Sequence, residues 1–266
     1  MDLGLQDKVA VLTGASKGIG FSSALALARE GARVSICARG QEGLDRAADR
    51  LRAETGADVL TVQADMGVRD DARRLMATAA ERFGRIDVLV NCAGSSPGGL
   101  LLDITEEQWF ASMNLKFLGY VRATTEVIPY MLEAGGGRIV NVIGNDGNKP
   151  SYWELTPGAA NAAGINVSQA LAEQYAPRGI LINVVNPGPV ATDRWDGLEK
   201  QMAKDRGMSQ DAAHQLAVRS IPTGRICRPE EVADLVCFLA SARNSFMAGA
   251  IINIDGAQRK AVMDCP

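Results

Sequence analysis

Short apolar segments alternate with longer amphipathic segments along most of this 266-residue chain. Seven apolar segments have the length and β-branched content of buried strands, and they cover residues 9–12, 33–38, 58–62, 88–91, 138–143, 181–185 and 250–254. Between them, apolar residues recur with a helical period over residues 22–30, 41–55, 69–83, 105–133, 158–175 and 230–240. This alternation predicts one α/β domain over residues 1–266, with a doubly wound, seven-stranded parallel sheet and helices on both faces.

A glycine-rich turn follows the first predicted strand and has the sequence Thr13-Gly14-Ala15-Ser16-Lys17-Gly18-Ile19-Gly20. Glycine has no Cβ, so such a turn lets backbone amides approach a pyrophosphate, and the following helix presents its positive N-terminal end to the same group. A strand before and a helix after are the context expected of a dinucleotide site. A purely structural turn is the alternative, because the spacing differs from the G-x-G-x-x-G pattern.

Composition narrows the range of partners. Hydrophobic residues make up 47% of the chain and the net charge is −3, so we expect a large core and neither nucleic acid nor anionic membranes as partners. No apolar run is long enough to span a bilayer, and the first residues lack a basic segment followed by an apolar one, so we expect a cytoplasmic protein. The five cysteines are scattered, which predicts reduced thiols and no metal site.

Further motifs occur near the ends of predicted strands and in the long central helix. Those near strand ends are Ala64-Asp65, Asn91-Cys92-Ala93-Gly94, the segment 186–192 and the closing Asn253-Ile254-Asp255-Gly256, and the one in the helix is Asn114. Together with the glycine-rich turn, they make the chain resemble a short-chain dehydrogenase/reductase from end to end. The resemblance implies a Rossmann-type sheet, an oxidoreductase that uses a nicotinamide dinucleotide, a small carbonyl or alcohol substrate, and a homotetramer or homodimer.

Charges near the glycine-rich turn favour the phosphorylated cofactor, NADP(H). In NAD-specific sites an acidic residue at the end of the second strand accepts hydrogen bonds from the ribose 2′-hydroxyl, whereas a 2′-phosphate requires cations. Here that strand ends in Cys37-Ala38-Arg39, and Lys17 adds a second cation. Arg39 can bind a phosphate through paired hydrogen bonds or stack on adenine. Solvated surface cations are the alternative explanation for both residues.

The resemblance also assigns roles within the cofactor site. It implies that Asp65 holds the adenine amino group, and that Asn91 and Gly94 face the adenosine ribose and the pyrophosphate. It further implies that Val190 and Thr192 bind the carboxamide. A tight turn without a ligand is the alternative explanation for the segment 91–94. The other cofactor contacts expected are Gly14, Ser16, Gly18, Ile19, Gly20, Ala93, Asn161, Pro187 and Gly188.

The usual catalytic residues of this family are missing from their expected positions. The family places a serine after the fifth strand and a Tyr-x-x-x-Lys pair at the start of the next helix; the lysine lowers the tyrosine pKa, and the tyrosine exchanges a proton with the substrate. Counting along the matching segments puts Gly144, Pro157 and Asn161 at these three positions, and only Asn114, the fourth member, is retained. Glycine, proline and asparagine cannot replace that proton relay.

Three functions therefore stay open. The first is NADP(H)-dependent reduction or oxidation of a small carbonyl or alcohol, with Tyr152 as a non-standard proton donor. Its helpers would come from Asn145, Asp146, Lys149 and water bound to Asn114. The second is a non-redox carbonyl reaction with Asp146 or Glu154 as base. The third is a nucleotide-binding regulatory or structural protein without turnover. An alternative for Tyr152 is an apolar anchor beside Trp153.

The longest segment without a predicted element, residues 191–222, is expected to form a substrate lid. Its apolar residues suggest a moderately hydrophobic ligand, although a helix packed on the core would show the same pattern. Thr156 and Pro157 predict the start of the helix that follows the missing serine. His214, the single histidine, is expected to face solvent and receives no role.

Overall fold

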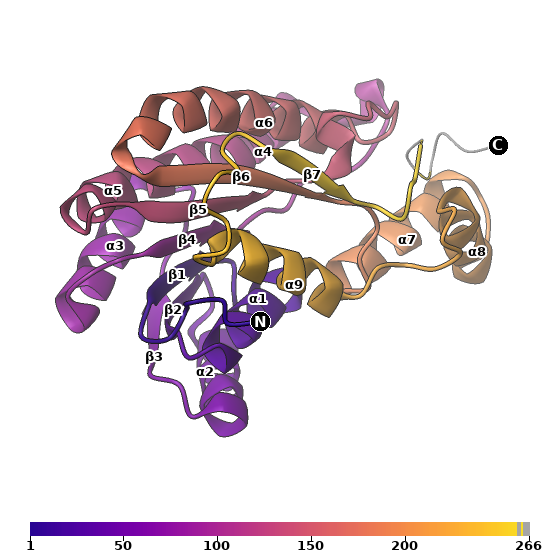
Figure 1. The fold of residues 1–266 in the computed structure, drawn as a ribbon. Helices are drawn as coiled ribbons and strands as arrows, with labels where there is room; N and C mark the ends of the chain where they lie inside the picture. The colour runs from indigo at the N-terminus through magenta and orange to yellow at the C-terminus, as the bar shows by residue number, and fades with distance from the viewer. Residues whose placement is uncertain (260–261, 263–266) are drawn as a thin grey trace.

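The computed structural model describes residues 1–259 and 262 and shows a three-layer α/β domain (Figure 1). A seven-stranded sheet forms the middle layer, with the order β3-β2-β1-β4-β5-β6-β7 and every neighbouring pair parallel. This confirms the predicted fold class. The strands are β1 (Val9–Thr13), β2 (Arg33–Ala38), β3 (Val59–Gln63), β4 (Val88–Asn91), β5 (Gly137–Val142), β6 (Ile180–Pro187) and β7 (Ile251–Ile254).

Helices cover both faces of the sheet (Figure 1). One face carries α1 (Gly18–Arg29), α2 (Gln41–Thr55) and α9 (Pro229–Ala240). The other carries α3 (Arg69–Phe83), α4 (Glu106–Ser112), α5 (Gly119–Glu133) and α6 (Leu155–Tyr175). Each face has its own apolar core, because the strands are buried on both sides. The remaining helices, α7 (Asp193–Asp205) and α8 (Gln210–Ser220), lie beyond the end of the sheet.

The helix predicted over residues 105–133 is interrupted in the structure. A π-helical turn, Met113–Leu118, separates α4 from α5 and keeps the segment helical while changing its hydrogen-bond pattern. Such turns occur where a helix accommodates one extra residue, frequently at functional sites. The interruption places Asn114 and Lys116 on the turn itself. Periodicity alone did not reveal it, because the apolar pattern continues through the turn.

The predicted start of the following helix is wrong by two residues. Helix α6 begins at Leu155 and not at Pro157, so Thr156 lies inside its first turn rather than at the N-cap. The Thr156 hydroxyl instead donates to the carbonyl oxygen of Pro97, 2.9 Å away. A contact from a distant loop thus replaces the local cap that the sequence predicted.

The strand order reverses between β1 and β4, and the loops after these two strands meet closely. Thr13 Oγ1 accepts hydrogen bonds from the amides of Cys92 and Ala93, at 3.0 and 3.2 Å. Gly14 has φ +65°, and a Cβ there would lie 2.7 Å from Ala93 Cα. Only glycine fits this contact, since any side chain would collide with backbone. In open α/β sheets, the crevice at such a reversal is where ligands bind.

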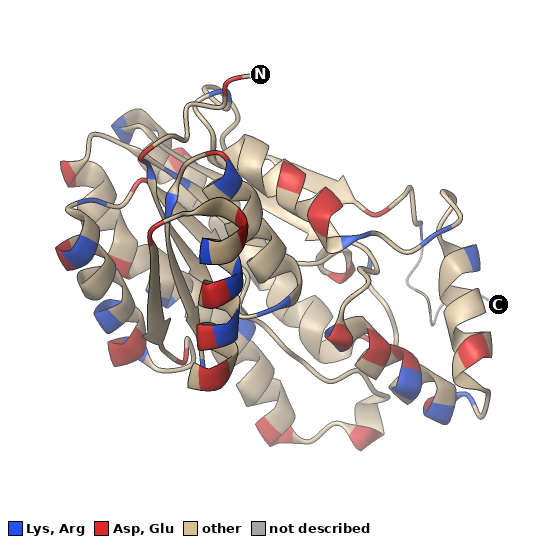
Figure 2. Cartoon of the chain, turned by 90° about the horizontal axis from the view of Figure 1, so that it is seen from below, with Lys and Arg blue, Asp and Glu red and all other residues tan. Residues whose placement is uncertain are grey.

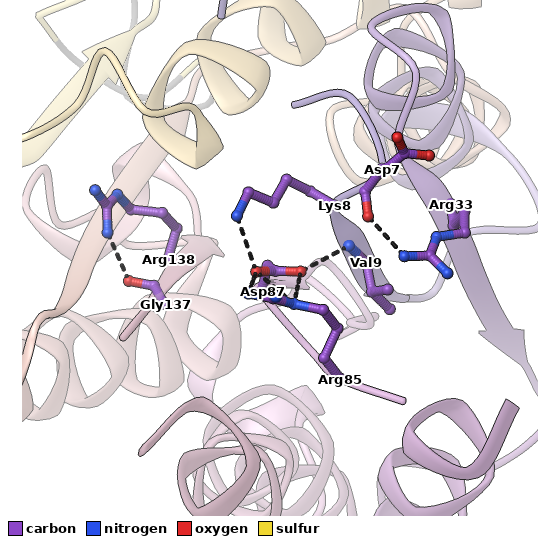
Figure 3. A network of polar contacts seen from close by, with 8 residues as sticks. All are labelled: Asp7, Lys8, Val9, Arg33, Arg85, Asp87, Gly137 and Arg138. Atoms are coloured by element: carbon purple, nitrogen blue, oxygen red, sulfur yellow. Dashed lines mark hydrogen bonds and ion pairs between the residues drawn. The ribbon is translucent and has the colours of Figure 1, made fainter. Parts of the chain in front are cut away.

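Asp87 connects the segment before β4 with the start of β1 at the opposite, amino end of these strands (Figure 3). Its buried carboxylate accepts a hydrogen bond from the Val9 amide at 3.0 Å. Lys8 Nζ lies 3.3 Å from the same carboxylate, and the Arg85 guanidinium contacts both of its oxygens. The network fixes the start of β1 against the start of β4. It therefore stabilises the central strands of the sheet at the end opposite to the crevice.

Most charged residues lie on the helices and loops outside the sheet (Figure 2). Blue and red positions alternate along the helices, whereas the strands carry almost none. No helix among the described residues has the length and hydropathy needed to cross a bilayer.

Replacing Asp87 with Ala should lower the free energy of unfolding by about 2–3 kcal/mol, because the buried Val9 amide loses its partner and two cations lose their counter-charge. Denaturant titration followed by circular dichroism measures this loss. Asp49→Ala is the matched control: its carboxylate is 80% exposed in a surface pair with Arg52, and it should change stability by less than about 0.5 kcal/mol. Equal losses in both variants would contradict a special role for Asp87.

Candidate functional site

Two adjoining cavities lie at the carboxyl end of the sheet. The larger one, of about 690 Å³, is called here the outer groove, and the smaller one, of about 160 Å³, the inner cavity. The inner volume is similar to the ~150 Å³ that accommodates benzene, so a small ligand fits there. The two spaces lie side by side, because they share the lining residues Ile19, Cys92, Gly94, Thr192, Arg194 and Leu198.

The outer groove brings together most of the residues predicted to bind the cofactor. The glycine-rich turn forms its floor, and the ends of β2, β3 and β4 form its sides. The predicted residues that line it are Gly14, Ser16, Lys17, Gly18, Ile19, Gly20, Arg39, Asp65, Ala93, Gly94 and Thr192.

The groove has the features that a dinucleotide needs. Helix α1 begins at Gly18, and no side chain caps it, so its first amide groups are available to an anion. A Cβ on Gly20 would lie 2.4 Å from the Gly14 carbonyl oxygen, so the helix packs directly on the turn. These observations fit a pyrophosphate at the start of α1.

Two cations face the part of the groove next to β2. Arg39 is exposed, and its backbone carbonyl accepts a hydrogen bond from Gln63 Nε2 at 2.8 Å, which fixes the end of the strand. Lys17 is also exposed, and its Nζ lies 3.0 Å from Asp193 Oδ2. This hydrogen bond holds the pKa of the Asp193 carboxyl below its usual value. Lys17 thus connects the glycine-rich turn to α7 across the groove.

Two of the predicted cofactor residues make other contacts. Asp65 lines the groove, but its carboxylate also accepts the Gly67 amide at 2.8 Å and so shapes the turn after β3. The Asn91 side chain is fully buried, and its Nδ2 donates to Asn141 Oδ1 at 2.9 Å. Asn91 therefore points into the core between β4 and β5, and only its backbone is available to the groove.

The inner cavity is mainly apolar. Four of the predicted cofactor residues line this cavity and not the outer groove, namely Asn161, Pro187, Gly188 and Val190. Thr192 lines both spaces. If a dinucleotide lies along the groove, its far end therefore enters this space. Apolar and aromatic side chains form much of the remaining wall: Tyr120, Val142, Ile143, Trp153, Trp195, Leu198 and Met202.

A buried polar pair lies beside Gly144, the residue that the sequence analysis expects at the position of the family serine. Asn161 Nδ2 donates to Asp146 Oδ1, and both residues are more than 90% buried. Gly144 has φ +154°, and a Cβ there would lie 2.6 Å from Asn161 Nδ2 and 2.7 Å from Asp146 Oδ1. A serine at this position would collide with the pair, so the absence of the serine and the presence of the pair belong together.

Lys116 is a site residue that the sequence analysis did not identify. It lies on the π-helical turn, is only 8% exposed, and lines the inner cavity. Its ammonium makes no hydrogen bond or ion pair with any residue that the structure describes. Burial lowers its pKa to about 8. The available signal was a single charged residue in an otherwise apolar helical segment, Met113–Leu118.

The two predicted catalytic residues lie outside the inner cavity. Asn114 Nδ2 donates to the Gly67 carbonyl at 3.1 Å, and its Oδ1 accepts from Arg122 at 2.7 Å, so its side chain supports the loop after β3. Tyr152 is 50% exposed, and its hydroxyl accepts a hydrogen bond from Arg206 at 3.3 Å. The structure does not bring either side chain to the cavity lining.

Lys149, a proposed helper, is also engaged elsewhere. Its ammonium forms an ion pair with Asp255 and a hydrogen bond to the Gln258 carbonyl, which fastens the loop after β5 to the segment after β7. Asn145 donates to Gln258 Oε1 at 2.8 Å in the same region. Of the proposed helpers, Asp146 alone both lines the inner cavity and has a charge that acts on the pKa of Lys116.

The segment predicted as a lid folds as α7 and α8 beside the inner cavity. Trp153 Nε1 donates to Asp205 at 2.8 Å and fastens the loop before α6 to the end of α7. Buried Glu199 accepts from Trp195 Nε1 at 2.6 Å and contacts His214 Nδ1 at 2.9 Å, so α7 and α8 are joined. His214, expected to face solvent, is half-exposed but engaged in this contact.

Within the described part of the chain, no group of three or more His, Cys, Asp or Glu side chains is arranged to hold a metal ion. The four cysteines in that part are free thiols, and burial raises the pKa of Cys92, which lines both cavities, to about 12. The charged side chains that line the inner cavity are Lys116, Asp146, Glu154 and Arg194.

Comparison with known proteins agrees with this architecture. The short chain dehydrogenase family model matches residues 8–203. A 3-oxoacyl-[acyl-carrier-protein] reductase, FabG, from Thermotoga maritima is 34% identical over 255 residues, which are 95% of this chain and 98% of that protein. An acetoacetyl-CoA reductase from Allochromatium vinosum is 30% identical over 250 residues, 94% of this chain and 97% of that protein.

Solved structures show the same likeness. The L-sorbose reductase of Gluconobacter frateurii, solved with NADPH and L-sorbose, has a TM-score of 0.92 and 31% identity, and the match covers 98% of this chain and 100% of that one. An actinorhodin polyketide ketoreductase, solved with NADPH, has a TM-score of 0.92 and 32% identity, and the match covers 95% of this chain and 97% of that one. The family match, the relatives and the seven-stranded parallel sheet agree: this chain belongs to the short-chain dehydrogenases, in the branch of NAD(P)-dependent short-chain reductases.

Proposed function

We propose that this protein is an NADP(H)-dependent reductase of a small, moderately hydrophobic carbonyl compound. The observation that carries the proposal is that a large groove lined by the glycine-rich turn adjoins a small, mainly apolar inner cavity, with six lining residues in common. The relatives described as reductases of 3-oxoacyl and acetoacetyl thioesters, and the neighbours solved with NADPH, support the same reaction class.

Each cavity has a distinct task in this reaction. The reduced nicotinamide supplies a hydride when it is bound. The glycine-rich turn and the start of α1 hold the pyrophosphate, and Arg39 with Lys17 neutralises the 2′-phosphate. Val190 and Thr192 orient the carboxamide at the junction of the two spaces. The apolar wall, including Trp153 and Trp195, excludes water from the substrate carbonyl.

By analogy with the family, we expect a homodimer or homotetramer. By the same analogy, we expect the C-terminal segment 260–266 to cover a neighbouring subunit; apart from Val262, it lies outside the described residues. Val262 lines the inner cavity.

We expect NADPH to bind at least about tenfold tighter than NADH, since paired hydrogen bonds from an arginine to a phosphate contribute this much or more. Fluorescence titration of both cofactors checks it. Arg39→Leu should weaken NADPH binding about tenfold or more and leave NADH binding nearly unchanged. Arg46→Leu, which removes an exposed guanidinium on α2 away from the groove, is the matched control. Equal affinities for the two cofactors in the wild type would contradict NADP(H) specificity.

Turnover distinguishes a reductase from a nucleotide-binding regulatory protein. We expect oxidation of NADPH, followed at 340 nm, with members of a panel that contains acetoacetyl-CoA, L-sorbose, and small aromatic and aliphatic aldehydes and ketones. Product analysis should show the corresponding alcohol. Tight NADPH binding without oxidation across this panel would instead support a binding function, and substrate conversion without loss of NADPH would support a non-redox reaction.

Tyr152→Phe tests the proton donor that the sequence suggested. Because the hydroxyl lies on Arg206 outside the cavity, we expect this variant to keep most of the wild-type kcat on an active member of the panel. Removal of a general acid would typically lower the rate by about 10²- to 10⁴-fold. A loss of that size, with unchanged NADPH affinity, would assign the role to Tyr152 after all.

A further inference from the structure

We propose that the Lys116 ammonium donates the proton to the substrate oxygen in the inner cavity, and that Asn161 positions Asp146 to keep this ammonium protonated. The inference rests on the proposed carbonyl reduction. It replaces the missing tyrosine, serine and lysine of the family with three residues from the π-helical turn, the loop after β5 and helix α6.

The geometry of Lys116 fits a donor that awaits a ligand. Its aliphatic stem packs on Gly94, where a Cβ would lie 3.1 Å from Lys116 Cγ and 3.3 Å from its Cε. Gly94 lines both cavities, so the Lys116 stem lies beside the boundary between the outer groove and the inner cavity. The residue is more than nine-tenths buried, and its ammonium contacts no hydrogen-bond acceptor among the described residues. A buried cation without an acceptor is costly, and a substrate oxygen would satisfy it.

The titratable groups around Lys116 come from four different segments. Asp146, from the short helix after β5, has the strongest effect, and Glu154, from the loop before α6, acts in the same direction. Arg194, from α7, opposes them because it has the same charge as Lys116. Cys92, after β4, is neutral at pH 8, because burial raises its pKa to about 12.

Burial outweighs the two carboxylates and brings the Lys116 pKa down to about 8. This value lies in the range where a general acid is effective near neutral pH. Asp146 favours the protonated form, so its removal lowers the pKa further.

Asn161 fixes the carboxylate of Asp146. The hydrogen bond from Asn161 Nδ2 leaves the other oxygen of the carboxylate available to the cavity. Gly144 makes room for this arrangement, as a side chain there would displace both partners. Asn161, at the position of the family lysine, thus acts through Asp146 and not on the substrate.

The proposed step balances with the reduced nicotinamide dinucleotide as the hydride donor. A hydride adds to the carbonyl carbon, and the π electron pair of the carbonyl moves to the oxygen. The oxygen forms a bond to a proton from Lys116 Nζ, the N–H bond breaks, and its electron pair stays on nitrogen. The products are the alcohol, the oxidised dinucleotide and a neutral amine, which regains a proton from solvent before the next turnover.

Lys116→Gln should lower the single-turnover rate of carbonyl reduction by about 10²- to 10⁴-fold, with NADPH affinity and thermal midpoint close to wild type. In the wild type the rate should fall above pH ~8, as the ammonium loses its proton. That limb should be absent from the residual activity of Lys116→Gln. Lys204→Gln, which removes an exposed lysine of α7 outside both cavities, is the matched control and should keep both rate and profile.

Asp146→Asn separates positioning from simple structural support. This substitution keeps the size of the side chain and an oxygen acceptor for Asn161, but removes the negative charge. The alkaline limb should therefore move to lower pH, and the rate defect should be larger at pH 8 than at pH 6. A purely structural role would lower the rate equally at every pH.

A readout independent of turnover is the titration of Lys116 itself. In protein labelled with ¹³C at the lysine ε-carbon, one resonance missing from Lys116→Gln should titrate near pH 8, and it should move to lower pH in Asp146→Asn. A Lys116 that titrates at the ordinary lysine value would overturn the inference. Retention of the wild-type rate and pH profile by Lys116→Gln would also overturn it, while leaving the reductase function intact. A wild-type protein that oxidises no NADPH with any panel member would instead refute the proposed function.

Discussion

The close approach of the loops after β1 and β4 is the constraint on which the rest of the site depends. Thr13 holds the Cys92 and Ala93 amides, and Gly14 leaves no gap between the two backbones. This contact sets where the strand order reverses, and therefore where the outer groove opens. It also places Gly94 beside the Lys116 stem, so one backbone contact connects the cofactor groove with the inner cavity.

The sheet and the groove floor were predictable from the sequence because they depend on local patterns. Buried parallel strands are short apolar runs, and a pyrophosphate site needs glycine next to the start of a helix. The positions of Asn91, Asn114 and Tyr152 were not predictable in this way. Each of these side chains contacts a residue far along the chain, namely Asn141, Gly67 and Arg206 respectively.

The family resemblance predicts that Gly144, Pro157 and Asn161 stand at the positions of the catalytic serine, tyrosine and lysine, but it does not predict what occupies this space. Counted along the chain, the three residues have no evident relation to one another. In the structure, Gly144 and Asn161 are neighbours. Because Gly144 has no side chain, there is room for the Asp146 carboxylate, which accepts a hydrogen bond from Asn161. Pro157 is buried in the first turns of α6 and leaves no ionisable group there. Lys116 could not be singled out because its burial depends on elements from across the sheet.

The π-helical turn Met113–Leu118 gives the long helical segment one residue more than a regular helix of the same length would hold. One residue corresponds to about 100° of rotation around a helix axis. The extra residue therefore determines how α5 is rotated about its axis relative to α4. The apolar face of α5 packs on the sheet, while Lys116 lines the inner cavity and Asn114 contacts the loop after β3. The position of the Lys116 ammonium thus depends on the number of residues in the turn as well as on the identity of residue 116. Deletion of one residue from the turn would rotate this side chain away from the cavity.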